Sequence, residues 1–183
     1  PNCRLPGQPC TYKIFISYRV AADKTTANNL YNLLHGQGIT TFLDSVCLPP
    51  KLGKNWETEF VMGLGGSDVF VPVISREAIN SPIKFWQDIT KLREDSPCDN
   101  VLLEYRMAIE LHARGLILKI APLFVGDQVG SNATEVTKYS FRDDPAAGLP
   151  ACHPNLSSSV VVTSVEQKVR DHLNEVGLGS PYY

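Results

Sequence analysis

The apolar run Ile14-Phe15-Ile16 is the feature that most constrains the fold, because its apolar side chains are consecutive instead of alternating. A strand with one face in water carries polar residues at every second position, so both faces of this strand are expected to be buried. Similar runs recur at residues 39–43, 69–74 and 116–125, and helical patterns separate them. This alternation predicts an α/β fold with a parallel sheet that is covered on both sides.

Four segments have the apolar spacing of amphipathic helices, at about residues 23–36, 56–64, 96–114 and 163–176. Asp23 is expected to cap the first of these helices. Ser96 is expected to cap the third, with Pro97 at the first helical position and Asp99 in the first turn.

The remaining segments predict loops and short strands. Two prolines and a glycine indicate a loop over residues 44–55, and Pro122 indicates an edge position or a bulge in the fourth strand. Short further strands are expected at residues 137–141 and 160–162. The expected fold is a flavodoxin-like three-layer sandwich around a central, mostly parallel five-stranded sheet.

The length of 183 residues predicts one domain, which we place at residues 11–178, between a flexible N-terminal arm at 1–10 and a tail at 179–183. A net charge of −2 argues against a nucleic-acid partner, and no apolar run has the ~20 residues that a membrane span needs. The chain opens without an apolar leader, which predicts no secretory signal, and without Met, which indicates a piece of a longer protein.

Cysteine usage predicts a reducing compartment. The five cysteines are an odd, scattered set with no C-x-x-C pair, and the four histidines cluster neither with one another nor with cysteines. We therefore expect free thiols, no metal site and a cytoplasmic location. The two N-x-[ST] sequons, at Asn132 and Asn155, are then chance matches.

Several motifs of nucleotide-binding and hydrolytic proteins are absent, namely G-x-G-x-x-G after the first strand, G-x-x-x-x-G-K-[ST] and G-x-S-x-G. A response-regulator receiver would need clustered acids after its first strand, where this chain has Ser17-Tyr18-Arg19. In parallel α/β sheets, ligands bind outside the carboxyl ends of the strands. Tyr18, Arg19, Asp44 and Ser75 are predicted to lie at such ends.

Two glutamates in the third helix have different surroundings. Glu110 has Arg106 four residues before it and Arg114 four residues after it, which predicts a solvated, ion-paired face. Glu104 has no basic residue among its one-turn neighbours, most of which are apolar. Such a carboxylate is partly desolvated, which raises its pKa and strengthens its interaction with a nearby cation. Glu104 is therefore a candidate catalytic residue, with a structural cap or network member as the alternative.

Four segments, taken in order, resemble a TIR domain, the Toll/interleukin-receptor module, over about residues 11–178. Ile14-Phe15-Ile16-Ser17-Tyr18 resembles the family's first box. Phe42-Leu43-Asp44, followed by Leu48-Pro49-Pro50, Gly53 and Trp56, resembles the second box and its BB loop. Residues 69–75 are similar to the third strand, and residues 98–104 to the C-to-E helix segment.

The resemblance implies one of two functions. Some TIR domains are scaffolds that associate with other TIR domains, and others cleave NAD+ at the nicotinamide–ribose bond with a glutamate that corresponds to Glu104. Tyr18-Arg19 and the Phe-Leu-Asp entry to the BB loop resemble the enzymatic group. We therefore expect an NAD+ glycohydrolase that takes NAD+ as substrate, needs no cofactor, and releases nicotinamide with linear, cyclic or variant ADP-ribose. Activation by self-association in immune or cell-death signalling is part of that expectation.

The same resemblance implies a role for each site residue. Glu104 would engage the ribose, Tyr18 and Arg19 would line the site with Arg19 on the pyrophosphate, and Asp44 and Trp56 would shape the BB-loop side. Each of the last four has a plainer alternative. Tyr18 and Trp56 are also typical core residues, Arg19 a typical surface charge, and Asp44 a typical turn former.

Two departures from the family pattern bear on this prediction. Asn100 stands where the family often has Trp, so an aromatic wall would come from Trp56, Phe85 or Trp86, or be missing. The BB loop is also longer by Lys51-Leu52. The competing predictions are a non-catalytic scaffold that recruits partners through the BB loop, and a flavodoxin-like nucleotide binder of another family.

Overall fold

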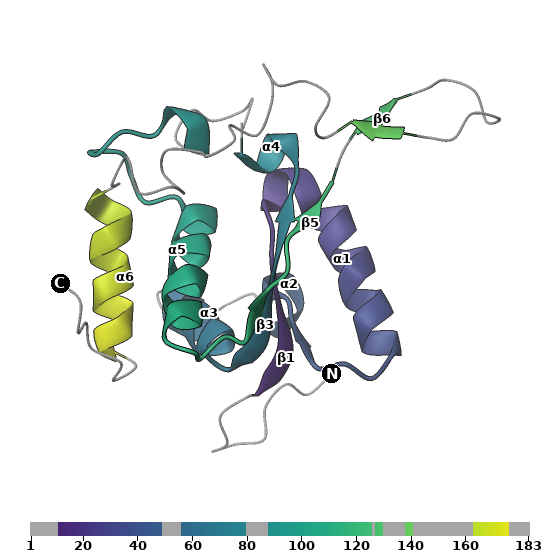
Figure 1. Cartoon of the computed structure of the whole chain (residues 1–183), viewed down its shortest axis with the longest axis horizontal. Coiled ribbons are helices and arrows are strands. Elements are labelled where there is room, and N and C mark those ends of the chain that lie inside the picture. The colour runs from purple at the N-terminus through teal and green to yellow at the C-terminus, as the bar shows by residue number, and fades with distance from the viewer. Residues whose placement is uncertain are drawn as a thin grey trace.

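The fold has three layers, with a sheet between helices (Figure 1). The structure is a computed structural model, and it describes residues 11–48, 56–79, 88–125, 127–129, 138–140 and 163–175. Helix α1 (Val20–Gly36) covers one face of the sheet, and helices α3 (Trp56–Gly65) and α5 (Asn100–Ala113) cover the other. Helix α6 (Thr163–Glu175) packs on the outer side of α5. The predicted α/β sandwich is confirmed.

The central sheet has five strands, and every pairing in it is parallel. Its order is β2-β1-β3-β4, and β5 also pairs with β3. The strands are β1 (Tyr12–Ser17), β2 (Thr41–Phe42), β3 (Ser67–Ile74), β4 (Lys119–Ile120) and β5 (Leu123–Phe124). Strands β1 and β3 are the long central pair, which explains why their sequences are apolar on both faces.

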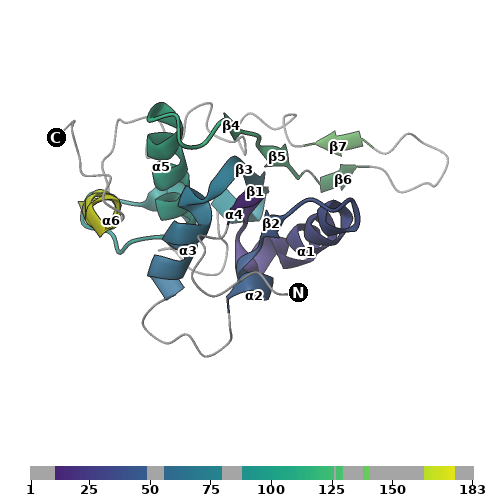
Figure 2. The same cartoon turned by 90° about the horizontal axis from the view of Figure 1, so that it is seen from below.

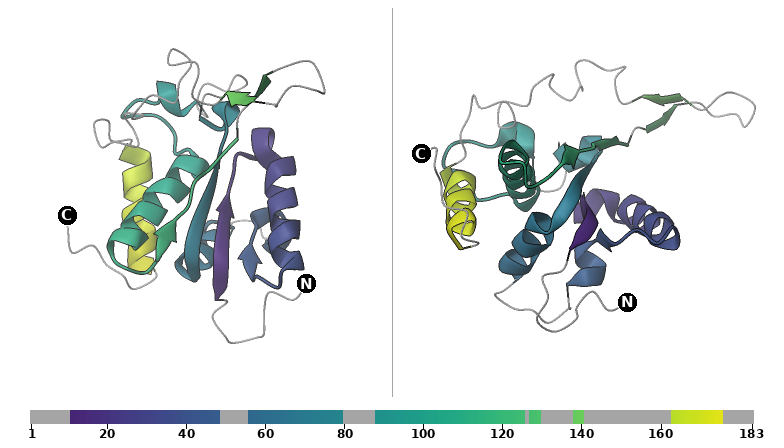
Figure 3. Two further views of the ribbon diagram at one scale, coloured as in Figure 1. Left: turned by 45° about the vertical axis from the view of Figure 1, so that its right-hand side comes forward. Right: turned by 60° about the horizontal axis from the view of Figure 1, so that its bottom comes forward.

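The strand predicted at residues 116–125 is interrupted. It forms β4 and β5, and Ala121 and Pro122 lie between them. Proline has no backbone N–H to donate, so it ends a ladder and is tolerated at an edge, which is where this segment lies. The strand predicted at 137–141 forms as β7 (Lys138–Ser140), but it pairs with β6 (Asp127–Val129) in an antiparallel ribbon outside the central sheet (Figures 2 and 3). The strand predicted at 160–162 lies outside the described residues.

Both predicted helix caps are wrong. Helix α1 begins at Val20, and Asp23 is a buried residue of its first turn that accepts a hydrogen bond from Ser75 Oγ at 2.9 Å. Helix α5 is capped by Asp99, whose carboxylate accepts from the backbone N–H of Leu102 at 2.9 Å. Ser96 instead accepts from the N–H of Arg93 in the preceding turn. In both cases a contact with another element fixes the aspartate, which helical spacing alone does not reveal.

Three short helices lie outside the four helices that the apolar spacing predicts. They are α2 (Asp44–Cys47), α4 (Arg76–Ile79) and the 3₁₀ helix at Ile89–Lys91. Helix α2 occupies the start of the loop expected at 44–55, and the rest of that loop beyond residue 48 lies outside the described residues. No helix in the described part of the chain is both long and apolar enough to cross a membrane.

The sequence predicted that both Arg106 and Arg114 pair with Glu110 on a solvated face of α5. The structure confirms only one of these two ion pairs. Glu110 pairs with Arg114 at 2.6 Å, as the spacing predicted. Arg106, however, pairs with Glu166 of α6, also at 2.6 Å. The expected solvated face of α5 is therefore partly covered by α6, and Arg106 links the two helices.

Aromatic rings organise the core on the α3–α5 face of the sheet. The ring of Phe42 stacks on Phe15 with centroids 4.7 Å apart, and Tyr12 meets it edge-on at 5.3 Å. Phe15 stacks in turn on Phe70, and all four residues are buried. Gly63 of α3 packs directly against Phe42, because a Cβ at position 63 would lie 2.6 Å from its ring. The close approach of α3 to the sheet therefore requires glycine at this position.

This packing predicts different effects on stability for alanine substitutions at two glycines of α3. Gly63→Ala is expected to lower the free energy of unfolding by about 1–3 kcal/mol, because Phe42 is wedged between other rings and has little room to move. Gly65→Ala meets no atom within 4 Å and is expected to be neutral or to gain up to about 1 kcal/mol from reduced chain entropy. Denaturant unfolding of the two variants measures the difference. Equal stabilities would contradict the packing of α3 on Phe42.

Candidate active site

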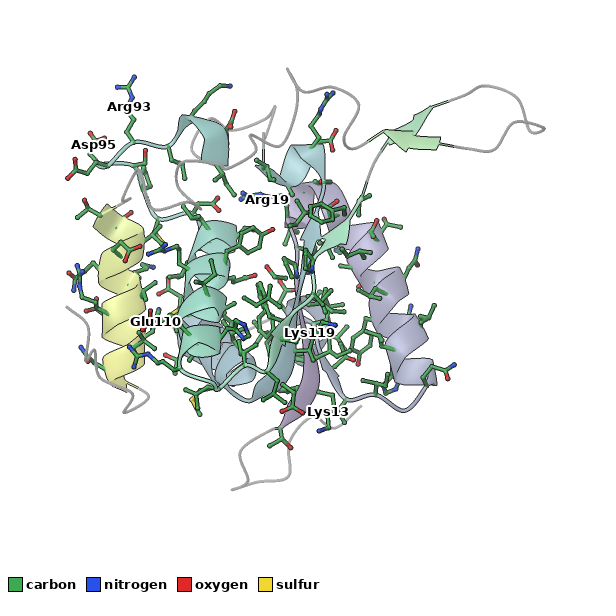
Figure 4. The ribbon with its side chains drawn as sticks, in the orientation of Figure 1. Lys13, Arg19, Arg93, Asp95, Glu110 and Lys119 are labelled. Atoms are coloured by element: carbon green, nitrogen blue, oxygen red, sulfur yellow. The ribbon has the colours of Figure 1, made fainter. Side chains whose placement is uncertain are left out.

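The carboxyl end of β1 carries the site. Side chains alternate between the two faces of a strand, so Ser17 and Arg19 face α5 while Tyr18 faces the opposite side. The contacts follow this alternation: Ser17 binds Glu104 of α5, Arg19 binds Asp99 at the N-cap of α5, and Tyr18 binds residues of α2. Figure 4 places Arg19 at this end of the sheet, opposite Lys13 at the start of β1. Three consecutive residues therefore connect the strand with two different helices.

Glu104 lies on α5 beside the end of β1, and its Oε2 accepts a short hydrogen bond from the Ser17 hydroxyl. The side chain is only partly exposed. Burial raises the pKa of Glu104 to about 8, and the negative charges of Asp44 and Asp99 act in the same direction. The hydrogen bond from Ser17 and the positive charge of Arg19 oppose this rise in the pKa. The Glu104 carboxyl therefore ionises at a much higher pH than an ordinary glutamate, near pH 8.

Tyr18 lies in the core with its hydroxyl on the site. Its side chain packs with Ile16 and Val73, and the residue is 5% exposed. The hydroxyl is hydrogen-bonded with the side chains of Ser45 and Asp44, the first residues of α2. Burial raises the pKa of Tyr18, so the hydroxyl stays protonated and can serve as a donor. The core alternative for Tyr18 and its contact with the start of the BB loop are therefore both realised.

Asp44 is the residue that brings α2 into the site. It is the first residue of α2 and is partly exposed. Its carboxylate accepts from the backbone N–H of Ser45, and its charge acts on both Tyr18 and Glu104. Ser17, Tyr18, Asp44 and Glu104 therefore form one cluster, which we call the β1-end cluster, built from β1, α2 and α5.

Arg19 is not arranged as the sequence predicted. The residue is 4% exposed, so its alternative as a surface charge is wrong. Its guanidinium forms a bidentate pair with the Asp99 carboxylate at 2.6 and 3.2 Å. Nε and Nη2 also donate to the backbone carbonyl of Ala78 in α4, at 3.1 and 3.0 Å. These contacts occupy the guanidinium, which argues against the predicted role on a pyrophosphate. Arg19 instead joins the end of β1 to α4 and to the N-cap of α5.

Trp56 is the first residue of α3, and its side chain lies outside the described part of the structure, as do Phe85 and Trp86. The prediction that one of these aromatic residues forms a wall of the site stays a prediction. Asn100 is the exposed first residue of α5, one helical turn before Glu104. The position where the family often has Trp therefore does lie on the same helix near the carboxylate.

Sequence reasoning missed two features of this region: the contact of Ser17 with Glu104 and the capping role of Asp99. Ser17 lies on the same face of β1 as Phe15 and Arg19, and that period-two spacing could have placed it against α5. Asp99 precedes an apolar helical run, as capping residues do, but Ser96-Pro97 gave a stronger signal. Within the described ranges, no group of three His, Cys, Asp or Glu side chains is placed to hold a metal ion. Cys47 and Cys98 are free thiols.

A family model of the TIR domain matches residues 14–150, which include most of β1, the BB-loop region and the α5 segment with Glu104. The chain belongs to the TIR domain family. The residues of the β1-end cluster come from three segments of the family pattern: the end of the first box, the entry to the BB loop and the C-to-E helix. The fold brings these segments together. No curated protein sequence matches the chain.

Solved structures with similar folds include the TIR domains of the activated Roq1 resistosome that directly recognises the pathogen effector XopQ. That match has 23% identity and a TM-score of 0.42, and it covers 62% of this chain and 57% of that one. A metazoan TIR-STING receptor from C. gigas matches with 16% identity and a TM-score of 0.48, over 93% of this chain and 43% of that one. The chain thus spans about half the length of these proteins.

The buried pair predicts a large loss of stability on removal of one partner. Asp99→Ala is expected to lower the free energy of unfolding by about 3–5 kcal/mol, because it leaves the Arg19 cation buried and removes the cap of α5. Asp68→Ala is the matched control, since it removes the exposed Lys13–Asp68 pair at 2.7 Å and is expected to cost at most about 1 kcal/mol. Denaturant unfolding compares the two. Similar losses would contradict the buried position of Arg19.

The raised pKa of Glu104 predicts a pH-dependent effect of Glu104→Gln. Between about pH 5 and pH 8 the folded protein keeps a proton on Glu104 that the unfolded chain has released, so the stability of the wild type falls as pH rises through this range. Glutamine does not titrate. The variant should therefore gain stability relative to the wild type with a slope of at most about 1.4 kcal/mol per pH unit. Unfolding measured at several pH values tests this, and a constant difference would refute it.

Proposed function

We propose that this TIR domain is an NAD+ glycohydrolase that cleaves the bond between nicotinamide and ribose. The observation that supports it best is the Glu104 carboxyl, partly buried at the carboxyl edge of the sheet, where parallel α/β folds bind their ligands. Perturbed carboxyl groups in such places are candidates for catalysis. The neighbouring Asp44 and Tyr18 supply a second carboxylate and a hydroxyl from the BB-loop side.

The chemistry suits a carboxylate that is weakly solvated. When the C1′–N bond breaks, nicotinamide leaves with the bonding electron pair as a neutral molecule, and positive charge develops at the ribose C1′ and ring oxygen. An ionised Glu104 would stabilise that charge and hold the ribose hydroxyls, as carboxylates do in glycoside hydrolysis. Water then adds to C1′ and loses a proton to give ADP-ribose, or an adenine nitrogen adds to give a cyclic product.

Self-association with other TIR domains is part of the proposal, as the family resemblance implies. Large apolar side chains are exposed at the outer strands of the sheet: Leu118, just before β4, is 70% exposed, and Phe124 of β5 is 46% exposed. Such side chains are common at protein contacts, and they favour the scaffold function as the second candidate. In both cases we place the domain in the cytoplasm, where the free thiols of Cys47 and Cys98 would persist.

Nicotinamide release from NAD+, measured by chromatography over a range of protein concentrations, tests the enzyme directly. Glu104→Ala is expected to reduce release by about 10²–10⁴-fold, because the variant loses the carboxylate that stabilises the developing cation. Glu110→Gln is the control on the same helix, since Glu110 pairs only with Arg114 among the described residues, away from the β1-end cluster. This control should keep wild-type activity.

The outcomes separate the two candidates. Release that rises more steeply than protein concentration and disappears in Glu104→Ala supports an enzyme activated by association. Release that persists in Glu104→Ala refutes the assignment of the carboxylate. Concentration-dependent association in sedimentation, without release at any concentration, favours the scaffold.

A further inference from the structure

We propose that Ser17 is the positioning residue for Glu104, holding Oε2 of the carboxylate so that Oε1 is the oxygen presented to substrate. This inference rests on the proposed function, because it assigns a role within the same reaction. Ser17 would not touch the substrate itself. It would act through the orientation and charge of Glu104.

The position of Ser17 suits this role because the residue is buried and its backbone is part of the central sheet. Ser17 is the last residue of β1, is 1% exposed, and stands opposite Pro72 in the parallel pairing of β1 with β3. Its hydroxyl donates to Glu104 Oε2. A serine hydroxyl has one proton to donate, so this contact uses its donor capacity. A rigid strand thus fixes one oxygen of a side chain that otherwise has three rotatable bonds.

The other oxygen of Glu104 is left for a ligand. Among the described residues, Ser17 is the only hydrogen-bond donor to the Glu104 carboxylate, and the side chain remains partly exposed. The ordinary explanation for Ser17 is that a buried hydroxyl simply needs an acceptor. The acceptor that this hydroxyl has is the Glu104 carboxylate of α5, in another layer of the fold.

The charges around Glu104 make this hydrogen bond consequential. Asp44 of α2 and Asp99 before α5 both act against the ionised carboxylate, and the hydroxyls of Tyr18 and Tyr105 lie close enough to respond to its charge. Arg19 is the cation among the described residues whose charge acts most on Glu104, and it is already paired with Asp99. The Ser17 hydroxyl is therefore the nearest group that stabilises the ionised Glu104 carboxylate. Without it, the pKa of Glu104 would rise further.

The test begins with a measurement that needs no activity. The Glu104 carboxyl carbon is titrated by NMR in protein labelled with ¹³C at glutamate side chains, and the Glu104→Gln spectrum identifies its signal. Ser17→Ala is expected to raise the midpoint by about one to two pH units, because a hydrogen bond to an ionised group is lost. Ser17→Thr keeps the hydroxyl and should stay within about half a unit of the wild type.

The second measurement is the pH profile of nicotinamide release. Wild-type release should rise with pH as Glu104 ionises, with a midpoint near 8. In Ser17→Ala the midpoint of the pH profile should move upward by the same number of pH units as the midpoint of the NMR titration of Glu104. On the plateau above it, kcat should fall about tenfold with little change in KM, because the carboxylate is ionised but no longer oriented. Ser17→Thr should restore both values.

Each outcome decides between the alternatives. An unchanged Glu104 titration in Ser17→Ala overturns the proposal, and so does a shifted titration with a wild-type kcat on the plateau. Loss of activity that Ser17→Thr does not restore, with no shift in the titration, assigns Ser17 to packing and also overturns it. A wild-type protein that titrates as expected but releases no nicotinamide refutes the proposed function instead, and the positioning role falls with it.

Discussion

The buried pair between Arg19 and Asp99 is the interaction on which the geometry of this end of the molecule depends. Arg19 continues directly from β1, and Asp99 caps α5, so the pair joins the strand at the centre of the sheet to the helix that carries Glu104. The same guanidinium binds the carbonyl of Ala78 and thereby holds α4. Burying both charges costs desolvation energy that only good geometry offsets, and the bidentate contact provides that geometry.

The pair also sets the electrostatic character of the site. One buried cation lies among several acidic groups: Asp99 pairs with Arg19, and the charge of Arg19 acts on Asp23 and Glu104 as well. Because Arg19 is paired with Asp99, the direct hydrogen bond to the Glu104 carboxylate comes from Ser17. Once ionised, a carboxylate in this state interacts more strongly with a new positive charge than one that already has a cationic partner. That property is the one that cleavage at an anomeric carbon requires.

The two candidate functions of this TIR domain draw on different parts of the same fold. Catalysis would depend on the carboxyl ends of the strands, where β1, α2 and α5 meet. Association would depend on outer surfaces, including the segment at β4 and β5 where Leu118 and Phe124 are exposed. An enzyme and a scaffold can share one fold, because each function would use its own site on it.

The sequence by itself determined the layers and the strand ends. Consecutive apolar residues in 14–16 and 69–74 required a sheet buried on both faces, and helical spacing placed the three covering helices and the perturbed surroundings of Glu104. Only the tertiary structure decided which partners the polar residues take. Asp23 and Asp99 were both expected near helix starts, Asp23 as a cap and Asp99 in a first turn, but Ser75 binds the first and Arg19 the second. Likewise Arg19 is a buried link and Ser17 a partner of Glu104 because β1 and α5 meet in space, at a separation of 87 residues along the chain for the Ser17–Glu104 bond. Local sequence patterns report spacing within an element, whereas these contacts depend on the packing of one element against another.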